Sequence, residues 1–573
     1  MPFITYPQHL PAYPMPSKHF TFHLLLSNFY LCPMLTPSVT NPILLQQPPN
    51  ARFYQIAIAS LLLLAAAYLS HLGYLPVDPR TDEARRALVT LEMMSSGNYW
   101  VPTLNGEPFL NKPPLFNWIL LASYKLFGVT PFALRLPVVL FTFMYSWIIW
   151  WFTRRYTQPM LALLAALFFA TNGRILIYDS LQGLIDIGFS SLVFLSFMWV
   201  YHYGQKQQYA LLFLLTYLAA ALAFLMKGLP ALVFQGIALL VYFTQQRRIK
   251  QLFSWQHLAG ITLFVLIVGG YYTVYFMQAG VTVKAMFSNM LVENTKRTVV
   301  DSNWPQTIKH FTTFPISLVY HFAPWALLMV FLLRRQLVTI LRSQPFIWYC
   351  SWVFLPGFTI YWLSPNMDTA ARYFFMMLPL LYIVLLYLYQ QPDAPAWQRP
   401  FVEYAWVGIV ALLGLGSLAL PFIAPTASMP YVWLQAPLLA ASLLLCAWQA
   451  WRHPKYKLVW LVMALVMVRW GFNWFVITNR GGYQAEQKAH FYQVMQLTAN
   501  RPLAIDKKAY TGNTDGFSYL YTLTTGRILP LADTTLPGRC YITSETSAAK
   551  YPHQLLYRWP GHLAPDLWLV VPR

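Results

Sequence analysis

Long apolar runs separated by short polar loops recur along the chain from about residue 52 to residue 477. A helix needs about 20 mostly apolar residues to cross a bilayer, and thirteen runs approach or reach that length. The pattern therefore predicts a polytopic α-helical membrane protein with about 13 transmembrane helices. The predicted spans cover residues 52–72, 132–153, 159–173, 180–203, 209–226, 229–244, 257–277, 314–333, 344–363, 373–390, 403–423, 430–450 and 456–477.

The charge of the loops decides how a fourteenth apolar segment, residues 114–128, is placed. If this segment crosses the membrane, Arg154 and Arg155 fall outside; if it lies along the surface, they fall inside. The second arrangement puts 13 basic residues into six short inside loops, which the positive-inside rule favours. It predicts an inside N-terminus and an outside C-terminus. The outer face then carries the polar segments 73–131, 172–182, 227–228, 278–313 and 364–372.

The chain changes character after about residue 480. RPLAID, RCYITSE and DLWLVVP alternate like short strands, and AEQKAHFYQVMQL has helical spacing. We therefore expect a small α/β domain over residues 480–573, on the outer face, following a transmembrane domain over residues 51–479. No catalytic motif stands out in it, so a stabilising cap is the simpler interpretation beside substrate capture or a lid.

The first 50 residues differ from both regions, because they hold ten prolines and one charged residue, Lys18. They lack the basic start, apolar run and small-residue cleavage site of a signal peptide. Two interpretations of this Pro-rich N-terminal extension stay open. It is either a disordered cytoplasmic segment or the result of a start codon assigned too far upstream.

The composition supports the assignment as a membrane protein and indicates which classes of partner the chain binds. Only 10% of the residues are charged and 57% are hydrophobic, whereas soluble proteins carry about 25% charged residues. The formal charge of +21 fits inside-loop charge and phosphate-binding groups, with membrane lipids as partners and no nucleic acid. The four cysteines show no metal-ligand spacing, so neither a disulfide framework nor a zinc site is expected.

Candidate chemistry concentrates in the first outer loop, which reads DEARRALVTLEMMSSGNYWVPTLNGEPFLNKPPLFNW from Asp82. Ionisable residues at a membrane are costly and mark functional sites by default. Asp82 and Glu83 offer a carboxylate that could act as a general base on an acceptor hydroxyl or phosphate. Arg85 and Lys112 offer cations for a lipid phosphate. The competing explanations are a helix cap for Asp82 and snorkelling to headgroups for Lys112.

A second acid is expected from the segment NGRILIYDSLQGLID, which holds Asp179 and Asp186. An acid placed in a membrane span is a functional candidate. Asp179 lies near the outer end of a predicted span, and Asp186, seven residues later, lies on the same helical face but deeper. We favour Asp179 as the second site carboxylate and keep Asp186 as the alternative.

Three later cations complete the candidate site. Lys227 follows an apolar run and either anchors the helix end or faces the site as a phosphate ligand. Arg297 and Arg372, the latter beside Tyr373, lie at the outer face, where the charge rule disfavours arginine. They need a local anion, and a phosphate group is the simplest one.

At these residues the chain resembles the bacterial aminoarabinose transferase and protein mannosyltransferase families. Both belong to the GT-C glycosyltransferases that use polyprenyl-phosphate sugars. The resemblance rests on DEARRA, SGNYWVP, LNGEPFLNKPPLFNW, LFG, FALRLP, GRILIYD, FLMKGLP and a later PW, and spans about residues 52–380. Family members usually carry Tyr where this chain has Arg86, and often Glu where it has Asn111. These departures leave the donor sugar open more than the reaction type.

The resemblance implies a GT-C architecture in the bacterial inner membrane, with the active site and the C-terminal domain in the periplasm. It implies inverting transfer of a sugar from an undecaprenyl-phosphate carrier to a periplasmic acceptor, with lipid A as the first candidate. Asp82 and Asp179 match the family's two acids, and Arg85 and Lys112 match residues that contact the lipid phosphate. The identity of the sugar and the need for a divalent metal stay open.

Three alternatives are kept. Within the enzymes, these are protein O-mannosyl transfer and glycosylation of a surface polysaccharide. From a different class, a lipid or sugar transporter should carry ionisable residues near the midplane on several helices. Here they gather at one predicted surface, which counts against a transporter.

Overall fold

The computed structural model describes residues 50–78, 82–284, 288, 304–364, 370–498, 501–508, 510, 514–533, 536–559 and 566–572. The Pro-rich extension and Arg297 lie outside these residues. Residues 42–573 belong to one compact unit. The boundary that we predict near residue 480 therefore falls within one unit and stays a prediction.

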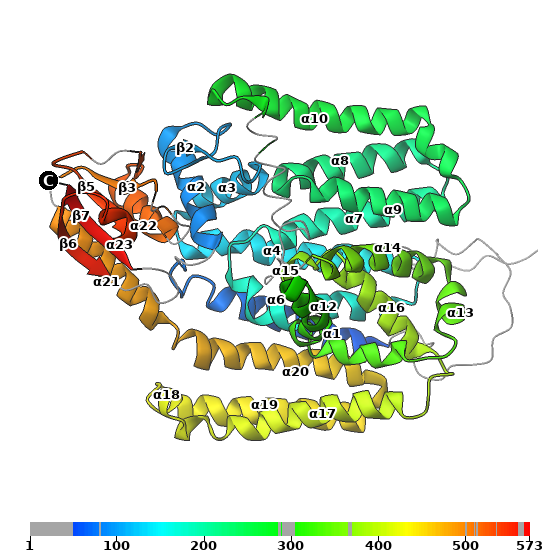
Figure 1. The fold of residues 1–573 in the computed structure, drawn as a ribbon. Helices are drawn as coiled ribbons and strands as arrows, with labels where there is room; N and C mark the ends of the chain where they lie inside the picture. Colours follow the sequence, from blue (N-terminus) through cyan, green and yellow to red (C-terminus); the bar gives the residue numbers. More distant parts are fainter. Residues whose placement is uncertain are drawn as a thin grey trace, which may run out of the picture. The chain divides into compact units, whose positions relative to one another are not determined.

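Helices dominate the described chain (Figure 1). The first group comprises α1 (Ala51–Ser70), α2 (Asp82–Ser96), α3 (Leu115–Phe127), α4 (Pro131–Thr153), α5 (Pro159–Ala170), α6 (Gly173–Ile177), α7 (Asp186–Gln205), α8 (Tyr209–Lys227), α9 (Pro230–Gln245) and α10 (Trp255–Ala279). The second comprises α12 (Trp304–His321), α13 (Leu337–Arg342), α14 (Pro345–Trp362), α15 (Ala370–Tyr373), α16 (Leu378–Gln390), α17 (Gln398–Ser417), α18 (Ala424–Ala427), α19 (Val432–Arg452) and α20 (Lys457–Gly471), which continues as a π-helix over Phe472–Ile477.

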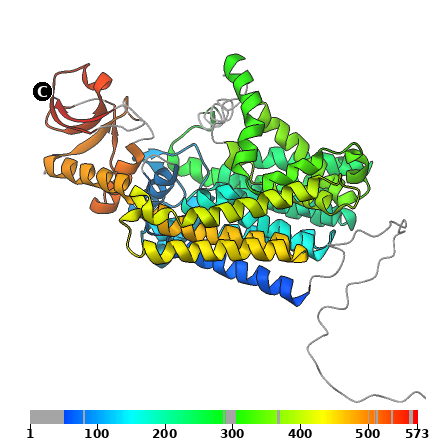
Figure 2. The ribbon, with the colours of Figure 1, turned by 90° about the horizontal axis from the view of Figure 1, so that it is seen from below.

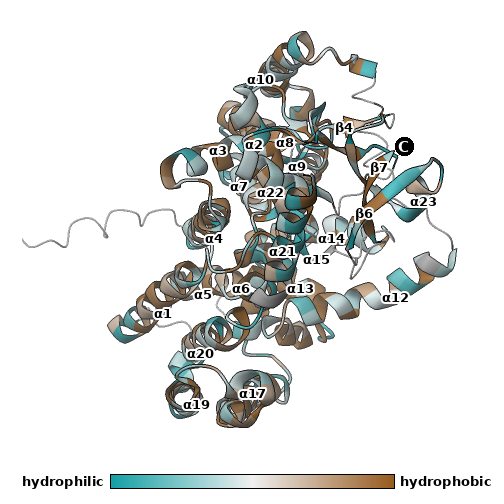
Figure 3. Cartoon of the chain, turned by 90° about the vertical axis from the view of Figure 1, so that its left-hand side faces the viewer, coloured by the Kyte–Doolittle hydropathy of each residue, from teal (hydrophilic) through white to brown (hydrophobic). Residues whose placement is uncertain are grey.

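The chain is a multi-pass membrane protein. Seven described helices are long and apolar enough to cross a bilayer, and the bent pair Pro159–Ala170 and Gly173–Leu181 makes an eighth candidate. Three more apolar helices, α3, α9 and α16, are shorter. Figure 3 shows the apolar colour over α1 and α17 and more hydrophilic colour on α21 (Gly481–Thr498). The count of 13 spans stays a prediction.

Helices that follow one another along the chain mostly pack together, as α7 does with α8 and α19 with α20. Other contacts join distant parts of the sequence: α1 packs on α20 (Figure 2), and α5 packs on α16. Such packing buries one face of α1, while apolar side chains such as Ile58 and Leu62 stay exposed on another, as a helix that faces lipid requires.

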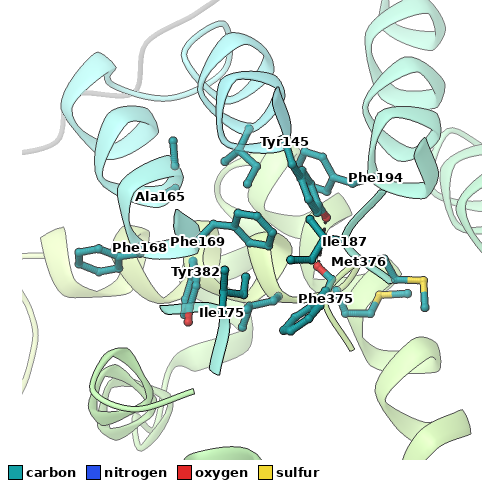
Figure 4. Packing of buried hydrophobic residues seen from close by; sticks show 14 of the residues in the cluster. Tyr145, Ala165, Phe168, Phe169, Ile175, Ile187, Phe194, Phe375, Met376 and Tyr382 are labelled. Atoms are coloured by element: carbon teal, nitrogen blue, oxygen red, sulfur yellow. Dashed lines mark hydrogen bonds between the residues drawn. The ribbon is translucent and has the colours of Figure 1, made fainter. Parts of the chain in front are cut away.

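Aromatic side chains fill the space between α4, α5 and α7 (Figure 4). The ring of Tyr145 packs on Phe169 with 4.3 Å between centroids, and its hydroxyl donates to the carbonyl oxygen of Phe375 at 3.1 Å. A buried tyrosine needs such a partner, because an unpaired hydroxyl in an apolar core is costly. This bond anchors the turn that follows α15. Arg372 and Tyr373 lie at the end of that helix.

The structure corrects the predicted span over residues 180–203, because this segment is not one continuous helix. The chain leaves α6, forms the short 3₁₀ helix η1 (Asp179–Leu181), and then turns extended at Gln182. The next long helix, α7, begins only at Asp186. Asp179 and Asp186 therefore do not share a helical face. Asn172 caps α6 and accounts for the earlier break after α5, whereas the break before α7 lies at Gln182, where the backbone is extended.

A five-stranded sheet occupies the C-terminal part of the described chain, with strand order β4-β3-β5-β7-β6. Its strands are β3 (Leu503–Asp506), β4 (Leu531–Ala532), β5 (Cys540–Ser544), β6 (His553–Trp559) and β7 (Leu567–Pro572). β3 pairs parallel with β4 and β5, whereas β7 pairs antiparallel with β5 and β6. The helices here are α21, α22 (Asp515–Thr525) and α23 (Glu545–Ala548), and α22 packs along α2.

The helix over Asp82–Ser96 carries an apolar stripe that includes Leu88 and Leu91, but its burial extends beyond that stripe. In the structure ten of its residues are buried, because α3 and α22 cover it and the hairpin of β1 (Thr103–Leu104) and β2 (Glu107–Pro108) packs beside it. The buried set includes charged residues as well as the stripe. α2 is therefore an internal element that can hold charged side chains in fixed positions.

Candidate active site

A pocket lies where the start of α2, the loop before α3, the start of α7, the end of α8 and α15 meet. It encloses about 430 Å³ of space that is partly open to solvent. Five of the lining side chains are cationic and two are carboxylates, an excess of three positive charges. The lining residues are Asp82, Arg85, Arg86, Asn111, Lys112, Leu184, Ile185, Asp186, Lys227, Arg372 and Tyr373.

Arg372 connects the two carboxylates of the pocket. Its Nη2 donates to Asp82 Oδ2 at 2.8 Å, and its Nε lies 3.7 Å from Asp186 Oδ2. The other oxygen of Asp186 accepts from Lys227 Nζ at 2.5 Å. The ammonium group of Lys227 also lies 3.9 Å from the centre of the Tyr373 ring, a cation–π contact. Carboxylates and cations thus alternate along one wall of the pocket.

Asp82 stays ionised in this setting. Burial raises its pKa, but Arg372, Arg86 and Arg85 oppose burial with their charges, and the pKa falls to about 2. Asp82 also lies in the first turn of α2, where the helix dipole favours an anion. Its side chain nevertheless keeps 40% of its surface exposed, so a ligand in the pocket can reach it.

Arg85 lies between Asp82 and a residue of the C-terminal region. Its Nε donates to Asp515 Oδ2 at 2.7 Å, and its Nη1 lies 3.7 Å from Asp82 Oδ1. Asp515 is the first residue of α22 and is almost fully buried. The sequence offers no signal for this contact, because the two residues are separated by 430 positions.

Arg86 and Asn111 line the same pocket, although sequence reasoning treats them only as departures from the family pattern. Arg86 is buried over the ring of Phe109, 5.4 Å from its centroid. Burial lowers the pKa of Arg86 to about 10, with Asp82 acting against that fall, so it remains a cation at neutral pH. The buried Oδ1 of Asn111 has no hydrogen-bond partner in the described chain and can accept one from a ligand.

Lys112 also lines the pocket, and its position follows from the sequence around it. Pro113 and Pro114 restrict the backbone directly after it. Pro114 is the N-cap of α3, so Lys112 lies in a short, restricted loop directly before a helix. A fixed ammonium at the pocket wall suits a phosphate ligand.

Comparison with known proteins gives this geometry a context. A protein family described as dolichyl-phosphate-mannose-protein mannosyltransferase matches residues 111–272. The crystal structure of ArnT from Cupriavidus metallidurans bound to undecaprenyl phosphate superposes with a TM-score of 0.63 at 19% identity, over 91% of this chain and 98% of that one. The chain shares the fold of this ArnT and is in that sense ArnT-like. The resemblance that the sequence predicts is thereby confirmed.

The curated relatives match a smaller share of the chain than the solved structure does. An uncharacterized protein of Aquifex aeolicus is 28% identical over 50% of this chain and 56% of its own length. The undecaprenyl phosphate-alpha-4-amino-4-deoxy-L-arabinose arabinosyl transferase of Edwardsiella ictaluri is 30% identical, over 32% of this chain and 34% of that protein. The same enzyme of Aeromonas salmonicida is 30% identical over 34% and 36%. The chain thus matches about half of the first relative and about a third of these transferases.

Glu83, which the sequence offers as a catalytic acid beside Asp82, does not line the pocket of the ArnT-like fold. Its carboxylate is buried and accepts from Arg135 Nε at 2.7 Å and Nη2 at 2.9 Å. It also accepts from the backbone N–H of Gly183 at 2.8 Å. Arg135 in turn donates to the carbonyl oxygens of Leu72 and Leu75. In this geometry Glu83 joins α2, α4 and two loops.

Asp179, the favoured second acid, is buried and forms an ion pair with Arg174 at 2.8 Å. It lies outside the set of pocket-lining residues, whereas Asp186, the alternative, belongs to it. The difference follows from the break before α7, which puts Asp186 rather than Asp179 at the start of the helix facing Arg372. Arg297 lies outside the described residues, so its role stays a prediction.

The question of a metal stays open in this ArnT-like chain. Among the described residues, no group of three or more His, Cys, Asp or Glu side chains is placed to hold a metal ion. Asp82 and Asp186 are the carboxylates of the pocket, and cationic side chains contact both of them. The described site therefore supplies its positive charge from arginine and lysine.

Proposed function

We propose that the chain is an inverting glycosyltransferase of the inner membrane that moves a sugar from undecaprenyl phosphate to lipid A, with its site toward the periplasm. The observation that carries the proposal is one pocket with five cations around an ionised, accessible Asp82. The solved ArnT with which the chain shares its fold binds undecaprenyl phosphate. A lipid-linked phosphate is a ligand for which this charge is suited.

The reaction is a single displacement at the anomeric carbon, in which the pocket residues have different roles. An acceptor oxygen attacks the anomeric carbon, the bond from that carbon to the phosphate oxygen breaks, and its electron pair stays on the phosphate. The departing polyprenyl phosphate thereby gains a negative charge. Arg85, Lys112 and Arg372 stabilise this charge, which is a large contribution in sites of this kind. Asp186 and Lys227 hold Arg372 and Tyr373 at the wall of the pocket.

The state of Asp82 supports a phosphate acceptor. A carboxylate whose pKa is about 2 is a weak base and removes a proton poorly from an ordinary hydroxyl. An acceptor phosphate is already ionised at neutral pH and needs no strong base. Asp82 then stabilises the positive charge that develops on the sugar carbon. Lipid A carries phosphate groups, so this supports it over a serine or threonine of a protein.

A second candidate is protein O-mannosyl transfer. The family match over residues 111–272 favours it, because that family is described by a protein mannosyltransferase. In this case the acceptor would be a hydroxyl, and Asp82 would have to act as a general base. The two candidates are distinguished by the molecule that gains the sugar.

Mass spectrometry of lipid A tests the proposal. Cells lacking the gene are compared with cells that express the wild type or Asp82→Asn at equal protein levels in the membrane. We expect a pentose- or hexosamine-sized increment with the wild type alone. An unchanged lipid A, in cells that make a lipid-linked donor, rejects lipid A as acceptor. Glycoproteins and surface polysaccharides are then the remaining acceptors.

Asp82→Asn also tests the role of the acid. Transfer by this variant at the wild-type rate would remove Asp82 from the reaction, whatever the acceptor. Undecaprenyl phosphate binding serves as the control for folding, because the cations that bind the phosphate are unchanged in this variant.

A further inference from the structure

One contact of the pocket comes from outside the transmembrane helices. Arg85 lines the pocket, yet its shortest contact is to Asp515 of α22, with 2.7 Å between Nε and Oδ2. The Asp515 side chain keeps only 1% of its surface exposed, whereas that of Asp82 keeps 40%. Arg85 therefore has a buried anchor on one side and an accessible carboxylate, 3.7 Å away, on the other.

The anchor is itself held in place. The Tyr510 hydroxyl donates to Asp515 Oδ1 at 2.6 Å, so both carboxylate oxygens of Asp515 are engaged. Asp515 is the first residue of α22, and that helix packs along α2, the helix that carries Arg85. A carboxylate fixed by a hydroxyl and by helix packing can define where a guanidinium lies. This is how a supporting residue orients one that contacts a ligand.

The geometry of arginine explains why the anchor matters. The guanidinium group is a planar fork whose edges can bind different partners. With Nε on Asp515, the terminal nitrogens of Arg85 remain directed to the pocket and to Asp82. Without Asp515, the nearest carboxylate is Asp82, and the side chain is free to close on it. The pocket would then lose a phosphate-binding cation and an accessible acid together.

We infer that Asp515 is a positioning residue that keeps the Arg85 guanidinium at the pocket and limits its contact with Asp82 to 3.7 Å, so that α22 completes the anion site. The C-terminal α/β region is thus a working part of the site rather than only a stabilising cap. The inference rests on the proposed function, because it takes undecaprenyl phosphate as the ligand of Arg85.

A double-mutant cycle on ligand binding tests the inference. The full-length chain is placed in lipid nanodiscs, and the dissociation constant for undecaprenyl phosphate is measured for the wild type, Asp515→Asn, Arg85→Gln and the double variant. We expect Asp515→Asn to weaken binding by about tenfold, a size within the usual range for coupled charged contacts. The double variant should bind no more weakly than Arg85→Gln alone, because Asp515 acts only through Arg85.

Two further variants separate positioning from general structural damage. Asp506→Asn is the matched control, because Asp506, at the end of β3 in the same C-terminal region, is a buried acid that accepts from Thr543 Oγ1 at 2.9 Å and does not line the pocket. It should bind like the wild type. Asp515→Glu keeps the charge and should recover part of the affinity that Asp515→Asn loses.

Each other outcome has a definite meaning. Tighter binding by Asp515→Asn would show that Asp515 acts through its charge alone and would overturn the inference. Additive losses in the double variant, or equal losses in Asp506→Asn, would also overturn it, since they indicate damage unrelated to Arg85. If the wild type itself does not bind undecaprenyl phosphate, the proposed function fails instead. The same cycle is then run with inorganic phosphate, which still decides whether Asp515 acts through Arg85.

Discussion

Asp82 owes its low pKa to three arginines, and this has a consequence for stability. A carboxyl group whose pKa is lower in the folded than in the unfolded protein stabilises the fold while it is ionised. Its contribution is complete above the unfolded pKa of 3.8 and is lost as the pH falls toward the folded value of about 2.

This dependence predicts how wild type and Asp82→Asn differ in acid. The wild type should melt at a higher temperature than the variant above pH 4, because only the wild type has the charged contacts to Arg372 and Arg85. The gap should close as the pH falls from about 4 to about 2. Thermal unfolding in nanodiscs across this range measures it. A gap that is independent of pH would contradict the assigned ionisation.

The pair of Asp186 and Lys227 predicts a different effect, because both side chains are almost fully buried. Lys227→Gln leaves a buried carboxylate with only the more distant Arg372 as its counter-ion. Breaking a buried pair from one side costs about 3–5 kcal/mol. We therefore expect a large fall in the unfolding midpoint.

The double variant Asp186→Asn/Lys227→Gln is the control for this prediction. It removes both charges and should recover much of the stability that Lys227→Gln loses. A double variant that is as unstable as the sum of two independent losses would mean that the side chains do not interact.

At the scale of elements, the break between α5 and α7 decides which acid reaches the pocket. Gly183 lies in the loop before α7, and a Cβ there would lie 2.7 Å from Leu134 Cγ and 3.0 Å from the Leu134 carbonyl oxygen. Its N–H also donates to Glu83. The loop therefore has no room for a side chain at this position.

Gly183→Ala should consequently displace the start of α7 and with it Asp186. We expect a destabilisation of about 1–3 kcal/mol, the usual cost of overpacking, together with weaker transfer. Gly236→Ala is the matched control, since a Cβ at Gly236 of α9 meets no atom within 4 Å. The lipid A increment and the thermal midpoint are both measured. A normal Gly183→Ala would show that the loop adapts without moving Asp186.

The same break marks what the sequence can and cannot predict about elements. Apolar runs predict the long helices well, because a membrane-spanning helix needs that length and composition. They predict a turn after residue 173, but they start the next span at residue 180, whereas α7 begins only at Asp186. The capping residue Asn172 is a local signal for a new helix start, and Gly183 is a signal for close packing. Without them, Asp179 and Asp186 look equivalent.

For the molecule as a whole, the sequence could predict the fold class and most of the pocket. Asp82, Arg85, Lys112, Lys227, Arg372 and Tyr373 are proposed from sequence, and the structure brings all of them to one pocket. Charge in or beside apolar segments is rare enough to be informative. Asp515 could not be found this way, because a single acid in a polar region is ordinary. Its meaning depends on tertiary packing.

The topology of the whole chain yields a prediction that fusion reporters can check. The positive-inside rule places the loop with Arg452, Lys455 and Lys457 inside and the C-terminus outside. Alkaline phosphatase, which is active only outside, should be active when fused after residue 573 and inactive when fused after residue 453. Reversed activities would contradict the predicted orientation and a periplasmic site.

The contact between Arg85 and Asp515 also sets a time at which activity can begin. The ribosome makes Arg85 first, and Asp515 follows 430 residues later. Until that stretch has been synthesised and folded, Arg85 lacks its anchor. On the proposed function, a partly made chain in the membrane therefore has an incomplete anion site until Asp515 has been added and α22 has folded.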